Sequence, residues 1–129
     1  VENGRICLVR QWRVALGEMT LEIPAGKLEE GEDPAACAAR ELTEETGLIA
    51  DGLELIAYSA GAPGFTNETT RIFRATRLRR GSSHPDEGEF VDVVWLPVPD
   101  VVEAIAQGLI KDAKTIVATL DAARRLNIT

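Results

Sequence analysis

An α/β fold with a mixed β-sheet is predicted from the order of elements along the chain. Strands are expected at residues 5–9, 19–23, 53–58, 70–78 and 91–96, and helices at 34–46, 100–107 and 112–126. Helices that alternate with short strands, several of them joined by tight turns, are typical of this class. The length of 129 residues suits one hydrophobic core, so we expect residues 1–129 to form a single domain.

The strands are recognised by the turn residues that bound them. The apolar run 5–9 follows the turn dipeptide Asn3-Gly4, and the run 19–23 stops at Pro24. A loop rich in glycine and proline separates the third and fourth strands. The last strand is β-branched and stops at Pro97.

The first helix has the clearest boundaries. Asp33 followed by Pro34 reads as an N-cap and a first helical residue, and Gly47 as a left-handed stop. Small apolar residues share one face, which should pack on the sheet; they are Ala35, Ala38, Ala39 and Leu42. Of the two later helices, one is closed by Gly108 and the other is opened by an Asp112 cap.

The opposite face of this helix is acidic. Glu44 and Glu45 lie three and four residues after Glu41, so their carboxylates share one side with that of Glu41. Such crowding destabilises a helix, and acidic groups near its C-terminus also oppose the helix dipole. A hard divalent cation removes both penalties. A simpler interpretation is a solvent-exposed acidic face in which Arg40 pairs with Glu44. Gly26, Glu32 and Gly47, at fixed distances from these glutamates, favour a metal site instead.

Composition narrows the class of protein further. The chain is 45% hydrophobic and 27% charged, as in ordinary globular domains, and its net charge of −7 argues against a nucleic-acid partner. No apolar run is long enough to cross a membrane, and the polar start does not read as a signal peptide. Cys7 and Cys37 form no CxxC pair. We expect Cys7 to be a buried strand residue, Cys37 to be a small helix residue, and both to be reduced, in a cytoplasmic protein.

Residues 26–48 resemble the signature of the Nudix hydrolases, G-x5-E-x7-R-E-U-x-E-E-x-G-U with U aliphatic. Every fixed position is occupied, at Gly26, Glu32, Arg40, Glu41, Leu42, Glu44, Glu45, Gly47 and Leu48. The resemblance implies an α/β/α sandwich with a mixed sheet and a catalytic loop-helix-loop. It also implies hydrolysis of a nucleoside diphosphate linked to a further group.

Outside this signature, the chain is similar to the ADP-ribose pyrophosphatase subfamily. Residues 9–13 and 21–26 resemble its entry segment, and Pro63 stands sixteen residues after Gly47, where the subfamily also has proline. The acidic segment 86–89 and the segment 108–115 resemble it as well. The resemblance therefore covers essentially the whole chain and implies Mg²⁺-dependent, or Mn²⁺-dependent, cleavage of ADP-ribose to AMP and ribose 5-phosphate.

The subfamily implies a role for each matching residue. The expected metal ligands are Glu41, Glu45, Glu89 and the carbonyl of Ala25. The expected catalytic residues are Glu87 as the base, together with Glu44 and Arg40; some Nudix enzymes take the base from the signature helix instead. The expected substrate-binding residues are Arg10, Arg13, Gly26, Pro63, Gly64 and Glu68.

Two other functions are compatible with the Nudix resemblance. One is a Nudix hydrolase of another nucleoside diphosphate sugar or of a dinucleoside polyphosphate. Another is a Nudix module that senses a nucleotide without cleaving it, although such a module should have lost part of its glutamate set. The subfamily is typically homodimeric, so we expect a homodimer. Because the chain starts at Val1 and relatives of this type commonly begin with another strand, we also expect the natural polypeptide to include a preceding segment.

Overall fold

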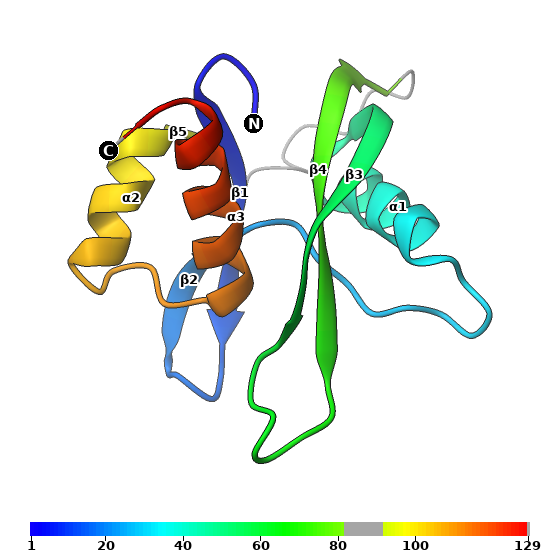
Figure 1. Cartoon of the computed structure of the whole chain (residues 1–129), viewed down its shortest axis with the longest axis horizontal. Helices are drawn as coiled ribbons and strands as arrows, with labels where there is room; N and C mark the ends of the chain where they lie inside the picture. The colour runs from blue at the N-terminus through cyan, green and yellow to red at the C-terminus, as the bar shows by residue number, and fades with distance from the viewer. Residues whose placement is uncertain (82–91, 129) are drawn as a thin grey trace.

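Two β-sheets lie between helices in the computed structural model, which describes residues 1–81 and 92–128. Helices α2 (Val98–Ala106) and α3 (Ala113–Arg125) lie on one side, and α1 (Pro34–Thr46) lies on the other (Figure 1). Helix α3 contacts helix α2 and also strands β3 and β4. The helix–sheet–helix layering agrees with the predicted α/β class.

The first sheet has the order β2-β1-β5, with β1 (Arg5–Arg13) in the centre, flanked by β2 (Glu18–Glu22) and β5 (Val93–Pro97). The first half of β1 pairs with β5 and its second half pairs with β2, both antiparallel. Strand β1 therefore extends beyond the predicted residues 5–9, because β2 supplies hydrogen bonds to its polar second half.

The second sheet is a long hairpin of β3 (Leu48–Ala60) and β4 (Thr69–Arg80). Strand β3 begins earlier than expected, directly after Gly47, because Leu48, Ile49, Ala50 and Gly52 pair with β4 and carry the strand through Asp51. Every pairing recorded among the described strands is antiparallel. The parallel pairing that a mixed sheet requires is not found in these residues, since the connection through α1 leads from β2 into the other sheet.

Helix α1 has the predicted boundaries and caps. The side chain of Asp33 accepts a hydrogen bond from the Ala36 amide (3.2 Å), and Pro34 is the first helical residue. Gly47 ends the helix at φ 76°, and its N–H donates to the Thr43 carbonyl (2.9 Å). These contacts satisfy backbone groups that a helix end leaves open, so the ends of the acidic face are well defined.

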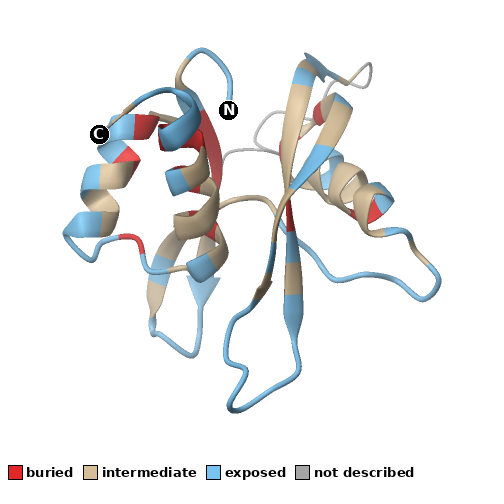
Figure 2. Cartoon of the chain, in the orientation of Figure 1, coloured by how far each residue is buried: buried red, intermediate tan, exposed pale blue. Residues whose placement is uncertain are grey.

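The main core lies between the first sheet and helices α2 and α3 (Figure 2). It contains the buried residues Ile6, Leu8, Val98, Val101, Ile110, Ala122 and Ala123. Helix α2 starts at Val98 rather than at the expected residue 100, because a proline in the first turn loses no hydrogen bond. Cys7 and Cys37 are both free; Cys7 is buried, as predicted, and Cys37 is buried as well. Among the described residues, no helix has the length and apolar character needed to span a bilayer.

Candidate active site

The loop after β2 is pressed against the acidic face of α1 at Gly26. A Cβ atom on Gly26 would lie no farther than 2.5 Å from each of the three carboxyl atoms of Glu41. A Cβ atom would fit only if the Glu41 carboxylate moved, so glycine lets the loop approach this carboxylate where it now lies. The structure therefore brings together two of the expected site residues, which lie fifteen positions apart in the chain.

Glu45 lies one turn further along α1 and contacts the same loop. Its Oε2 accepts a hydrogen bond from the Ala25 amide (3.2 Å). Burial raises the pKa of Glu45; the bond from Ala25 opposes this shift, and the negative charge of Glu41 adds to it. A half-buried carboxylate beside another one is an arrangement that a bound cation stabilises.

Arg40 ties the loop to the helix. Its Nε and Nη2 donate to the two carboxyl oxygens of Glu32 (2.8 and 2.9 Å), and this pairing lowers the pKa of Glu32 to about 2. Its Nη1 donates to Glu41 (2.9 Å) and to Glu44 (3.2 Å). The expected contact with Glu44 is present, but the two-pronged pairing with Glu32 is the stronger one. The catalytic role predicted for Arg40 stays a prediction.

The donor atoms gathered here suit a hard divalent cation. Glu41 and Glu45 offer carboxylate oxygens beside the backbone of Ala25 and Gly26, and Mg²⁺ and Mn²⁺ prefer oxygen ligands. Within residues 1–81 and 92–128, no three His, Cys, Asp or Glu side chains are grouped closely enough to hold a metal. The other expected ligand and the expected base, Glu89 and Glu87, lie outside the described residues.

Arg13 is bound by a buried glutamate. Its Nε and Nη2 each donate to Glu22 at 2.7 Å, and Glu22 is only 3% exposed. Arg10 is exposed on the same strand, β1. Trp12, between the two arginines, is 58% exposed and so is not part of the core. The structure leaves Arg13 half exposed, with one edge of its guanidinium engaged by Glu22.

Lys114 is a cation that the sequence-based reasoning did not single out. Its Nζ donates to Glu22 (2.9 Å) and to Asp112 (2.9 Å), so it joins α3 to the first sheet. It lines a cavity of about 790 Å³ that Ala25, Gly26 and Glu41 also line. In the sequence, the one feature that could have drawn attention to Lys114 is its position two residues after Asp112, the N-cap of α3.

The loop around Pro63 lies elsewhere in the molecule. Pro63 and Gly64 are exposed at the tip of the β3–β4 hairpin, away from α1 (Figure 1). Glu68, at the end of this loop, lines the same cavity as Glu41. Within this chain the structure thus brings Glu68, but not Pro63 and Gly64, to the cavity beside the acidic helix.

Comparison with known proteins assigns the family. The NUDIX domain model matches residues 1–119. The chain belongs to the Nudix family.

Individual relatives refine this picture. The chain is 40% identical over 119 residues to an ADP-ribose pyrophosphatase of Bacillus subtilis (strain 168), covering 91% of this chain and 64% of that protein. It is also 40% identical over 118 residues to a methanol dehydrogenase activator of Bacillus methanolicus, covering 90% of this chain and 64% of that protein. The chain therefore spans slightly less than two thirds of these relatives.

A solved structure described as an ADP compounds hydrolase superposes with a TM-score of 0.79 at 24% identity. The match covers 98% of this chain and 68% of that chain, and together with the NUDIX domain match it confirms the predicted fold.

Proposed function

We propose that this chain is a metal-dependent pyrophosphohydrolase that cleaves ADP-ribose to AMP and ribose 5-phosphate. The observation that carries the proposal is the contact between the Gly26 loop and the carboxylates of Glu41 and Glu45. Two carboxylates of α1 lie there against the loop backbone, beside a cavity large enough for a nucleotide. A non-catalytic sensor would not need the complete glutamate set.

In this proposal Glu41, Glu45 and the Ala25 carbonyl hold Mg²⁺, or Mn²⁺ in its place, and Glu89 completes the site. The bound ion would neutralise the diphosphate and lower the pKa of an attacking water. Arg40 keeps Glu41 and Glu44 in place by hydrogen bonds. The free edge of the Arg13 guanidinium would bind phosphate oxygens, while Arg10, Pro63, Gly64 and Glu68 would act on the rest of the substrate.

The base that takes the proton from water is proposed to be Glu87, with Glu44 as the alternative. Glu44 is 57% exposed and holds one hydrogen bond from Arg40, so water can reach it. If Glu87 is the base, Glu87→Gln should lower turnover about 10²- to 10⁴-fold with little change in affinity for ADP-ribose. A mild Glu87→Gln and a severe Glu44→Gln would place the base on α1 instead.

A substrate panel tests the reaction and its specificity. ADP-ribose, other nucleoside diphosphate sugars and dinucleoside polyphosphates are incubated with Mg²⁺, and the release of AMP and of phosphate monoesters is measured. The proposal requires the highest kcat/KM for ADP-ribose. A higher kcat/KM for another compound would make the chain a Nudix hydrolase of that compound. Hydrolysis of none of them would favour a Nudix module that senses a nucleotide without cleaving it. A panel of substrates is needed because one relative at 40% identity is named as a methanol dehydrogenase activator and not as an ADP-ribose pyrophosphatase.

We also propose a homodimer in the cytoplasm. Large apolar side chains are exposed together on the β1–β2 hairpin and its turn, namely Trp12, Val14, Leu16 and Met19. Trp12 and Met19 are direct cross-strand partners, so their side chains share one face of the sheet. Such a patch favours burial against a second copy. The two free cysteines suit a reducing compartment.

A further inference from the structure

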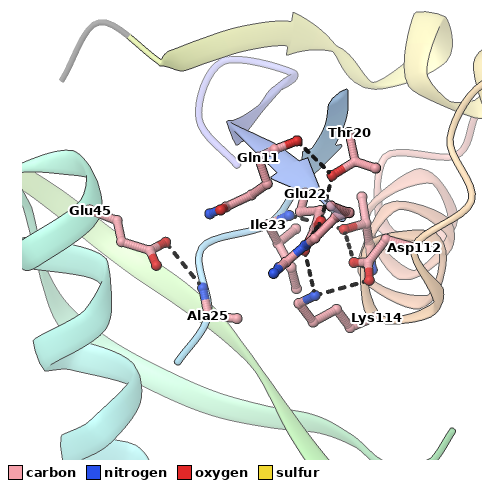
Figure 3. A network of polar contacts seen from close by, with 10 residues as sticks. Gln11, Thr20, Glu22, Ile23, Ala25, Glu45, Asp112 and Lys114 are labelled. Carbon is pink, nitrogen blue, oxygen red and sulfur yellow. Dashed lines mark hydrogen bonds and ion pairs between the residues drawn. The ribbon is translucent and has the colours of Figure 1, made fainter. Parts of the chain in front are cut away.

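The segment from Glu22 to Ala25 leads from β2 into the proposed metal loop, and it is held at three points (Figure 3). The Glu22 carboxylate accepts hydrogen bonds from Arg13, Thr20 and Lys114. The amide of Ile23 donates to the hydroxyl of Thr115 (2.9 Å). The amide of Ala25 donates to Glu45 (3.2 Å). Only the last of these contacts involves a proposed metal ligand on α1.

Thr115 lies in the first turn of α3 and is completely buried. Its hydroxyl donates to Asp112 Oδ2 at 2.6 Å, a carboxylate oxygen that also accepts from the Thr115 amide (3.2 Å). Because a hydroxyl has one proton, that donation leaves its lone pairs for the amide of Ile23. The orientation of the hydroxyl is thus set by the N-cap of α3.

Pro24 connects this contact to the metal loop. Its ring fixes its own φ and restricts Ile23 to extended conformations. The segment between the Ile23 amide and the Ala25 carbonyl therefore has few ways to absorb a displacement. A shift at Ile23 is passed on to the backbone of Ala25 and Gly26, which lies against Glu41.

We propose that Thr115 is a positioning residue for the metal-binding loop, and that its hydroxyl sets where the Ala25 carbonyl lies relative to Glu41 and Glu45. The inference rests on the proposed metal-dependent function and assigns part of it to the start of α3. Outer contacts that orient ligands typically change metal affinity by about 10- to 100-fold when they are lost. The same range is expected here.

Two substitutions at Thr115 separate the hydroxyl from the packing. Thr115→Val keeps the shape and removes the hydrogen-bond acceptor, whereas Thr115→Ser keeps the hydroxyl and removes a methyl group. Thr119→Val is the matched control: Thr119 is one turn later on α3, is also completely buried, and its hydroxyl has no partner among the described residues.

Mn²⁺ binding to the substrate-free chain is measured by calorimetry, and folding is followed by thermal unfolding. Thr115→Val should weaken Mn²⁺ binding by about 10- to 100-fold, while Thr115→Ser and Thr119→Val should bind as the parent chain does. Equal weakening in the valine and serine variants would show that packing matters rather than the hydroxyl, and overturn the inference. Unchanged binding in Thr115→Val, or an equal loss in Thr119→Val, would also overturn it.

A further variant covers the case in which Thr115→Val does not fold. Pro24→Ala leaves every contact of Thr115 in place and makes the connecting segment flexible. It should weaken Mn²⁺ binding without a matching loss of thermal stability, and unchanged binding would refute the inference. A parent chain that binds no Mn²⁺ would refute the proposed function together with this inference. A parent chain that binds Mn²⁺ and cleaves ADP-ribose, with unaltered variants, would refute only the role of Thr115.

Discussion

Replacing Gly26 by alanine tests the contact on which the proposed site depends. The added Cβ would lie within 2.5 Å of all three carboxyl atoms of Glu41, whereas ordinary carbon contacts are about 3.5 Å or longer. The carboxylate must therefore move by about 1 Å or more. A misplacement of about 1 Å in a reacting constellation can lower the rate about 10²-fold. We expect kcat/KM to fall by about that factor.

Folding should be nearly unaffected by this substitution. Gly26 does not have a positive φ, so alanine is compatible with its backbone, and the group that must move is the end of a flexible side chain. A glycine-to-alanine change at such a site is neutral or slightly stabilising, by about 0.4–1 kcal/mol. The expected signature is thus a loss of activity at an unchanged or raised melting temperature.

The assay compares Gly26→Ala with Gly61→Ala, in kcat/KM, Mg²⁺ dependence and melting temperature. Gly61 also lacks a positive φ, and a Cβ there would meet nothing within 4 Å. The control should retain activity, and Gly26→Ala should need more Mg²⁺ for half-maximal rate. Parental rate and Mg²⁺ dependence in Gly26→Ala would refute the idea that the loop and Glu41 form one site.

Three further measurements probe the same structure. Glu45→Gln should keep the fold and lower turnover by several orders of magnitude, because a neutral amide is a poor ligand for a dication; near-normal turnover at saturating Mg²⁺ would contradict this. The pKa of Glu22 is lowered from 4.5 to about 2, chiefly by its hydrogen bonds from Arg13. A lowered pKa stabilises the fold above the unfolded value, so about 3 kcal/mol should be lost as the pH falls from about 4.5 to about 2. Urea unfolding with chelator present should show this loss, and Glu22→Gln should lack it; identical pH profiles would count against the pairing. Light scattering at micromolar concentration should give the mass of two chains, and Val14→Asp should shift it toward one; a parent mass of one chain would count against the dimer.

Local signals in the sequence were sufficient for the acidic helix. Asp33, Pro34 and Gly47 act through backbone geometry within one turn of the helix ends, so they could be read without knowledge of the fold. The metal-site prediction for Glu41 and Glu45 followed from helical spacing together with the family resemblance. The buried position of Cys7 was predicted from its place in an apolar strand and is confirmed.

The lengths of two strands and the contacts of the start of α3 depend on residues that are distant in the sequence. The extents of β1 and β3 depend on partner strands, whose hydrogen bonds carry polar and turn-forming residues into the ladder. Thr115 and Lys114 gained their contacts with Ile23 and Glu22 only when α3 packed beside β2. The two residues of each pair are 92 positions apart in the chain. A single threonine or lysine at the start of a helix does not indicate which distant residue it will contact. Spacing along the chain thus determined which groups share the face of α1, whereas tertiary packing alone determined which groups hold the opposing loop in place.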